Sequence, residues 1–339
     1  MKRPTQADVA RIAGVSRATV SYVLNDTTDQ RIPISPETRQ RVLDAIAALG
    51  YEIDARAQAL RSGETKTIGV LVPMYENPFF WQILLGIASE AEANGYSLLL
   101  AHNILTPEQQ TRSIRELAEQ RVDGLILMIS FKELSESIMT QVRKSSRPIV
   151  ELTASESEFD VVRQGYGDGA RALMTHLFDL GHKRIGFLFG VTLRSQGKDR
   201  LTAYQYSLES AGLGVDDSLI IQCGEQMEDG YRAALGLLSR PDRPTALIAI
   251  NDLLGIAAIR AAADLGLRVP DDVSIAGFDD ITFTRYSVPR LTTVTGSPEQ
   301  NGRDAVRLLL KRLAEPDRPQ EVITADWRLH IRESTGRAP

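Results

Sequence analysis

The alternation of short apolar runs with longer amphipathic stretches from Thr67 onward most strongly restricts the fold of this chain. Four apolar runs come first and four more follow: TIGVLVP, YSLLLA, GLILMI and RPIVEL, then RIGFLFG, SLIIQC, TALIAI and VSIAGF. Helical patterns over 78–94, 107–120 and 133–145 alternate with the first four. Such runs are typical of parallel strands covered by helices on both faces. About nine strands fit two layers better than one, so the sequence predicts an α/β core of two lobes with parallel sheets.

The first 50 residues show a different pattern, which predicts a unit of three helices. The expected helix starts are Thr5 with Asp8 as capping-box partner, Ser16, and Ser35 followed by Pro36. The expected apolar faces consist of Val9 and Ile12, then Val20, Val23 and Leu24, then Val42, Leu43, Ile46 and Leu49. Gly50 is expected to end the third helix.

Gly14 separates the first two helices by a tight turn, which is typical of a helix-turn-helix. In that motif the second helix lies in the DNA major groove and its first residues contact base edges. Its outward face would carry a guanidinium, which can bond guanine, and a small methyl group, which can contact thymine. A plain helical hairpin with a polar face is the alternative. The candidate DNA-contacting residues are Thr5, Ser16, Arg17, Ala18, Thr19, Ser21, Tyr22 and Asn25.

The segment VARIAGVSRATVSYVLN resembles the helix-turn-helix of the LacI/GalR (lactose-repressor/galactose-repressor) family of bacterial transcription regulators. Other segments are similar to later family motifs, in the same order: RIPISPETRQRVLDAIAALGY, TKTIGVLVPMYENPFF, HLFDLGHKRIGFL, AINDLLGIAAIRAAADLGLRVPDDVSIAGFDD, PRLTTV and RLHIREST. The resemblance implies a sequence-specific DNA-binding regulator, expected to be a repressor, without enzymatic activity or a cofactor. It places base reading on Arg17, Ala18 and Tyr22, where many members carry Arg at the last position.

The resemblance also implies a domain organisation. It assigns a DNA-binding head to 1–50, a hinge helix to 51–63, and a periplasmic-binding-protein-like core for effector binding and dimerisation to 64–339. Within the core, the first lobe is expected at about 66–163 and 295–320, and the second at about 164–292 and 322–334.

In the family the hinge helix folds on DNA, and a leucine wedges between base steps in the minor groove. Leu60 matches that leucine, and Ala57 matches the small residue that lets the helix approach the groove. Ile53, Asp54 and Gln58 depart from the usual family residues. Because isolated helices of this length are marginal in water, a flexible linker is the alternative.

Members of the family bind a small effector between the lobes, at the carboxyl ends of the strands. The matching positions are Tyr75, Phe79, Phe80, Arg194, Arg200, Asn251 and Asp279. The implied effector is a small polar molecule, expected to be a sugar or sugar derivative, since Asp279 and Arg200 can bond hydroxyls and rings can cover apolar sugar faces. Thr153 and Glu225 replace an Asp and an aromatic residue that members often carry. Asn251 could instead cap the following helix, and either phenylalanine could belong to the core.

Composition narrows the classes of function. The net charge is −5, yet residues 1–63 carry nine Lys/Arg against seven Asp/Glu, so polyanion binding is expected only there. The single cysteine, Cys223, excludes an internal disulfide. Without an apolar leader or a run of membrane-spanning length, we expect a cytoplasmic protein.

The four histidines lack metal-ligand spacing, and neither a phosphate-binding glycine loop nor a nucleophile–base set is evident. His176 and His182 are expected to be structural. The rival classes are a free-standing sugar-binding receptor and an α/β enzyme. The expected partners are near-palindromic operator DNA, a small effector and a second copy of the chain, since no heptad tail supports a tetramer.

Overall fold

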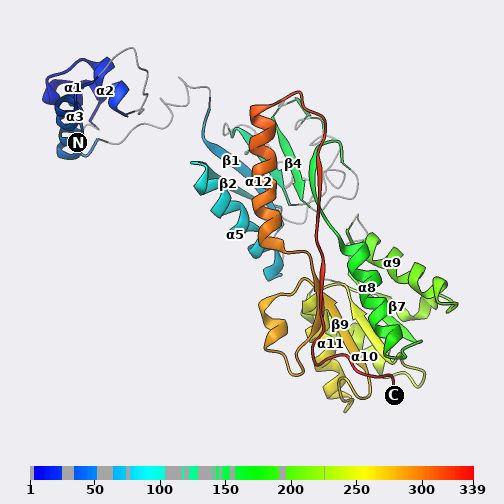
Figure 1. Cartoon of the computed structure of the whole chain (residues 1–339). Coiled ribbons are helices and arrows are strands. Elements are labelled where there is room, and N and C mark those ends of the chain that lie inside the picture. Colours follow the sequence, from blue (N-terminus) through cyan, green and yellow to red (C-terminus); the bar gives the residue numbers. More distant parts are fainter. Residues whose placement is uncertain are drawn as a thin grey trace. The chain divides into compact units, whose positions relative to one another are not determined.

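The chain forms two compact units, Met1–Thr65 and Lys66–Pro339 (Figure 1). The computed structural model describes residues 4–24, 34–51, 64–73, 77–103, 117, 122–128, 140, 143–144, 147–152, 157–190, 196–224 and 226–339, without the side chains of 102, 103, 196 and 197. No helix within these ranges is long and apolar enough to cross a membrane.

The N-terminal unit contains the three predicted helices: α1 (Gln6–Ala13), α2 (Arg17–Leu24) and α3 (Pro36–Leu49). The capping box of α1 is confirmed, because Thr5 and Asp8 each accept a hydrogen bond from the other's backbone N–H. Gly14 follows α1 with a φ of 65°, a left-handed conformation that glycine adopts readily. At α2, Ser16 Oγ accepts from the Thr19 N–H at 3.1 Å, as its predicted capping role requires.

The hydrophobic core of the N-terminal unit contains alanines that the sequence patterns did not predict to be buried. Val9, Val20 and Val42 are buried as expected, but the other buried positions include Ala10, Ala13 and Ala45. The expected burial of Ile12 and Leu43 is wrong, since they are 50% and 43% exposed. Each lies about 100° around its helix from the centre of the buried face. Small residues therefore fill the contacts between the helices, and the larger side chains beside them lie off the buried face.

The first lobe of the larger unit is built on a fully parallel six-stranded sheet in the order β11-β5-β4-β3-β1-β2. Its strands are β1 (Thr67–Pro73), β2 (Ser97–Asn103), β3 (Gly124–Leu127), β4 (Ile149–Leu152), β5 (Asp160–Gln164) and β11 (Val322–Ala325). Helices α5 (Pro78–Ala93) and α12 (Pro298–Ala314) pack closely against each other (Figure 1). A Cβ on Gly86 would lie 1.9 Å from the Glu299 carbonyl oxygen, so this crossing requires glycine.

The second lobe has a six-stranded sheet in the order β12-β10-β9-β8-β6-β7. Its strands are β6 (Ile185–Phe189), β7 (Ile220–Gln222), β8 (Ala246–Ala249), β9 (Ser274–Phe278), β10 (Thr292–Thr295) and β12 (Arg328–His330). Its helices are α8 (Tyr166–Asp179), α9 (Gln196–Ser210), α10 (Met227–Leu238) and α11 (Asp252–Asp264), with 3-10 turns at Asp217–Leu219 and Thr282–Arg285. Strand β12 pairs antiparallel with β10, and the other pairs are parallel. Two α/β lobes with parallel sheets are therefore confirmed.

One part of the expected lobe division is wrong. The resemblance places segment 322–325 in the second lobe, but β11 pairs in parallel with β5 in the first sheet, with Val322 opposite Val161. The chain crosses to the second sheet only after β11. Burial along this edge strand alternates, with every side chain at least partly exposed, so its residues alone do not show which sheet it completes.

Candidate DNA-binding face and effector site

Helix α2 presents the polar face that a groove-binding helix requires. Arg17 and Ala18 are exposed, whereas Val20 and Val23 are buried against the other two helices. Tyr22 is partly buried at the edge of the outward face. Both N-terminal side chains of this face are thus accessible to a ligand as large as DNA.

Three hydroxyl groups among the candidate DNA contacts also have structural roles. Thr5 Oγ1 donates to Asp8 Oδ2 at 2.7 Å within the capping box. The hydroxyls of Ser16 and Thr19 lie 2.9 Å apart in a mutual hydrogen bond at the start of α2. A backbone phosphate would therefore meet hydroxyls that the fold already orients.

Several predicted site residues lie outside the described residues, and their roles stay predictions. They are Asn25 of the head, Ala57 and Leu60 of the hinge with the departures Ile53, Asp54 and Gln58, and Tyr75, Arg194, Thr153 and Glu225 of the core.

In the larger unit, Asp279 connects the two lobes. It follows β9 and is 3% exposed. Its Oδ2 accepts a hydrogen bond from Asn77 Nδ2 at 2.9 Å, and its Oδ1 accepts one from the Tyr166 hydroxyl at 3.0 Å. Asn77 caps α5 in the first lobe and Tyr166 begins α8 in the second. One carboxylate thus joins elements of both lobes.

The backbone at Asp279 is in an unfavourable conformation, with a φ of 111°. Such conformations cost roughly 1–3 kcal/mol in residues with a side chain, and they cluster at binding and catalytic sites. The Asp279 N–H donates to the Val294 carbonyl at 2.7 Å, which helps to hold this geometry.

Arg200, the second strong candidate, is 6% exposed and lies beside the same tyrosine. Its guanidinium carbon is 4.2 Å from the centre of the Tyr166 ring and 5.2 Å from that of Phe278. Nη1 donates to the Ile250 carbonyl at 2.6 Å, whereas Nε has no hydrogen-bond partner among the described residues. A buried donor without an acceptor is costly, so this group is suited to a polar ligand.

Tyr166 is the site residue that sequence reasoning missed. It lies in the segment GYGDG, whose glycines lack the spacing of a phosphate-binding loop. Its position directly after β5, at the carboxyl edge of a parallel sheet, was the available signal. Burial, and then the negative charge of Asp279, raise the pKa of the Tyr166 hydroxyl well above its usual value, so it remains a hydrogen-bond donor.

A second buried carboxyl group lies near Asp279. Burial, and then the charge of Asp279, raise the pKa of Asp252 well above its usual value. Asp252 accepts hydrogen bonds from Thr293 Oγ1 at 2.6 Å and from the Ile281 N–H at 3.0 Å. These contacts account for Asp252 structurally, which leaves Asp279 as the candidate carboxylate for a ligand.

Of the remaining described candidates, a pair of phenylalanines adjoins Tyr166, and an asparagine caps a helix. Phe79 is 2% exposed, and its ring centre lies 6.5 Å from that of Tyr166 and 5.4 Å from that of the partly buried Phe80. Asn251 Oδ1 accepts from the Leu254 N–H at 2.9 Å, so this side chain caps α11, as its alternative role predicted.

The histidines have the structural contacts that were expected. His176 Nε2 lies 3.0 Å from Thr335 Oγ1, and His182 hydrogen bonds with Thr245 and Ser274. Within the part of the chain that the structure describes, no group of His, Cys, Asp and Glu side chains could hold a metal ion.

Both units match known protein families. Residues 5–53 match the family of bacterial regulatory proteins, lacI family, and residues 174–335 match the periplasmic binding protein-like domain. The HTH-type transcriptional repressor PurR of Mannheimia succiniciproducens is 34% identical over 331 residues, covering 97% of this chain and 98% of the relative. The repressor of the same name from Haemophilus influenzae is 35% identical over 314 residues, 92% of each chain.

Solved structures agree with these relatives. The Lac repressor dimer bound to operator and the anti-inducer ONPF matches with a TM-score of 0.87 at 27% identity, over 99% of this chain and 100% of that one. The complex of the transcriptional regulator CelR with cellobiose matches with a TM-score of 0.73 at 29% identity, over 98% and 100%. With repressors above 30% identity matching almost end to end, this chain belongs to the LacI family, whose members are DNA-binding transcriptional regulators with a ligand-binding core and not enzymes.

Proposed function

We propose that this repressor binds a near-palindromic operator as a homodimer, and that a small polar effector bound at Arg200 and Asp279 controls its operator affinity. The observation that supports this most strongly is the pair of hydrogen bonds from Asn77 and Tyr166 to Asp279. A ligand that bonds Asp279 acts on a group that already joins the two lobes.

The chemistry of the site favours a ligand rich in hydroxyl groups, and we propose a sugar or sugar derivative. An ionised carboxylate has about four lone-pair directions, so Asp279 can accept further hydrogen bonds beside those from Asn77 and Tyr166. The free Nε–H of Arg200 can donate to a ligand oxygen. The neighbouring ring of Phe79 suits the apolar face of a sugar. Structural neighbours were solved with cellobiose and with ribose.

In the head, we propose that Arg17, Ala18 and Tyr22 read bases, with Ser21 on the same face of α2, and that Ser16, Thr19 and Asn25 approach phosphates. The exposure of Arg17 and Ala18 supports this assignment. Leu60 and Ala57 are proposed to enter the minor groove as part of a hinge that folds on DNA. A single unit of this size contacts only one half-site, so two copies would read a palindrome.

Exposed apolar side chains support a homodimer formed through the core. In the first lobe, Trp81, Leu85 and Leu100 are 56%, 64% and 51% exposed. In the second lobe, Phe283, Tyr286 and Val288 are also largely exposed. Trp81 and Leu85 lie one turn apart on α5, and large apolar groups exposed side by side commonly mark a protein interface. Sedimentation at micromolar concentration should give a dimer, and a monomer both with and without DNA would contradict the proposal.

One experiment tests the whole scheme. Operator sequences are selected from random DNA with the full-length protein, and sugars and nucleobases are then screened for those that change binding to the selected sequence. The proposal requires one preferred palindrome and a sugar that changes its affinity in the parent but not in Asp279→Ala. Turnover of a bound sugar, or a response only to nucleobases, would contradict it.

A further inference from the structure

A polar cavity lies at the edge of the first sheet where its strands begin. It has a volume of about 450 Å³ and adjoins the amino ends of β4 and β5, where Ile149 and Asp160 begin the strands. The loop that follows α12 closes it through Pro316 and Arg318. Tyr166, in contrast, follows the carboxyl end of β5. Because these strands are parallel, the cavity is separate from the site of Arg200 and Asp279.

The residues that line this cavity carry more positive than negative charge. Four of them are arginines, at 143, 147, 312 and 318, and two are acids, Glu158 and Asp160. Arg143 pairs with Glu158 at 2.7 Å. The half-buried Arg147 makes no ion pair within the described residues. Within the described residues, the lining thus carries positive charge that its own acids do not balance.

Asp160 is shared between two guanidiniums. Its side chain is fully buried, and it accepts from Arg312 Nη2 at 2.8 Å and from Arg318 Nη2 at 2.6 Å. Burial raises the pKa of Asp160, but the hydrogen bonds from Arg312 and Glu321 outweigh this and hold it below the usual value. Asp160 therefore remains ionised and neutralises only one of its two partners.

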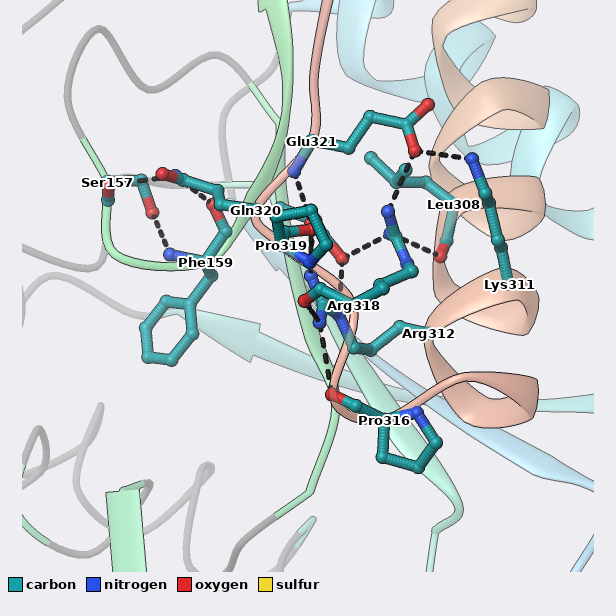
Figure 2. Close-up of polar contacts among 11 residues, drawn as sticks. Ser157, Phe159, Leu308, Lys311, Arg312, Pro316, Arg318, Pro319, Gln320 and Glu321 are labelled. Carbon is teal, nitrogen blue, oxygen red and sulfur yellow. Dashed lines mark hydrogen bonds and ion pairs between the residues drawn. The ribbon is translucent and has the colours of Figure 1, made fainter.

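The protein places other acceptors around the same arginines. Figure 2 shows Arg312 and Arg318 among backbone carbonyls and the carboxylate of Glu321. Arg312 donates to the carbonyls of Pro316, Arg318 and Pro319, and Arg318 Nη1 donates to Glu321 at 2.7 Å. Even so, Nε of Arg318 is buried without a partner among the described residues, in a side chain that is only 7% exposed. Donors remain in excess of acceptors.

We propose that this arginine-lined cavity binds a small oxyanion, a phosphate or carboxylate group carried by a metabolite. The planar guanidinium fork matches the two oxygens of such a group. A volume of about 450 Å³ is within the range of small-molecule sites. The bound anion would join the amino ends of two strands to the loop between α12 and β11, away from the effector site.

The test titrates the full-length protein with inorganic phosphate and, separately, with citrate at constant ionic strength, by calorimetry. We expect one site per chain for at least one of the two anions. Arg147→Ala should weaken binding at least about tenfold, and it leaves the buried Asp160 network intact. Lys144→Ala is the matched control, because it removes a neighbouring exposed cation that does not line the cavity.

Three results would overturn the proposal. They are no binding of either anion up to on the order of 10 mM, an equal loss in Lys144→Ala, and a loss in Arg200→Ala with none in Arg147→Ala. The last result would place the anion in the effector site. Binding that persists in Arg200→Ala supports the proposal, whether or not a sugar controls the operator.

Discussion

The outward face of α2, with Arg17 and Ala18, and the buried cluster around Asp279 present their side chains in opposite ways. Arg17 and Ala18 are exposed, as the contacting groups of a helix that enters a groove would have to be. Arg200 and Asp279 are 6% and 3% exposed, and both already bond to protein groups. A substitution on the outward face of α2 should therefore remove one contact with DNA. A substitution in the cluster around Asp279 should disturb several hydrogen bonds at once.

The largest expected effect comes from removing Arg200, the cation of the cluster around Asp279. Arg200→Ala removes the free donor and uncovers the Tyr166 and Phe278 rings, so the effector response should fall by about 100-fold or more, as for a lost charged hydrogen bond with its packing. Effector titrations by calorimetry measure this. Arg232→Ala, an exposed ion-pair variant on α10, is the control. Normal effector binding in Arg200→Ala would remove this residue from the site.

A smaller effect is expected from a substitution on the outward face of α2. Arg17→Ala should cost about 1–3 kcal/mol on the preferred operator and relax discrimination at one base pair. Binding to a panel of single-substituted operators measures both quantities. Arg11→Ala, which removes an exposed cation paired with Asp8 on α1, should leave the discrimination unchanged. An equal loss on every sequence in Arg17→Ala would make Arg17 a phosphate contact.

Tyr166→Phe tests the network more finely, since it keeps the ring and removes one hydroxyl. Asp279 loses a donor to its charge, and effector affinity should weaken by about 1.5 kcal/mol, roughly tenfold. Tyr204→Phe removes another buried hydroxyl of the same lobe, one that donates to the Ile185 carbonyl, and serves as the control. If the two variants bind effector equally well, the hydroxyl at 166 only stabilises the fold.

The smallest expected effect is local to the head. Thr5→Ala removes the α1 cap and should destabilise that helix by about 1 kcal/mol, while Thr5→Ser should retain the cap. Hydrogen exchange of the α1 amides measures the change. Operator affinity should fall only as far as helix stability does. A loss of affinity with unchanged exchange would instead show that Thr5 contacts DNA directly.

Local sequence was sufficient for the elements that depend on neighbours along the chain. The capping box of Thr5 and Asp8, the turn at Gly14 and the continuous apolar strands such as β1 and β9 were predictable, because each depends on residues within a few positions. The family resemblance also pointed to Arg200 and Asp279, which the structure brings together around Tyr166. It did not locate Tyr166 or the bond from Asn77, since neither follows from spacing within one helix or strand.

The sequence by itself therefore determined the helix-turn-helix and the two α/β lobes with parallel sheets. Tertiary structure alone decided that Asn77, Tyr166 and Asp279 meet, that β11 completes the first sheet, and that Ile12 and Leu43 remain exposed. The physical reason is distance along the chain. Asn77 and Asp279 are 202 positions apart, and only the packing of two lobes brings such groups within hydrogen-bonding distance. Sequence periodicity and capping residues predict only single helices, turns and strands, and not which of them meet in the folded chain.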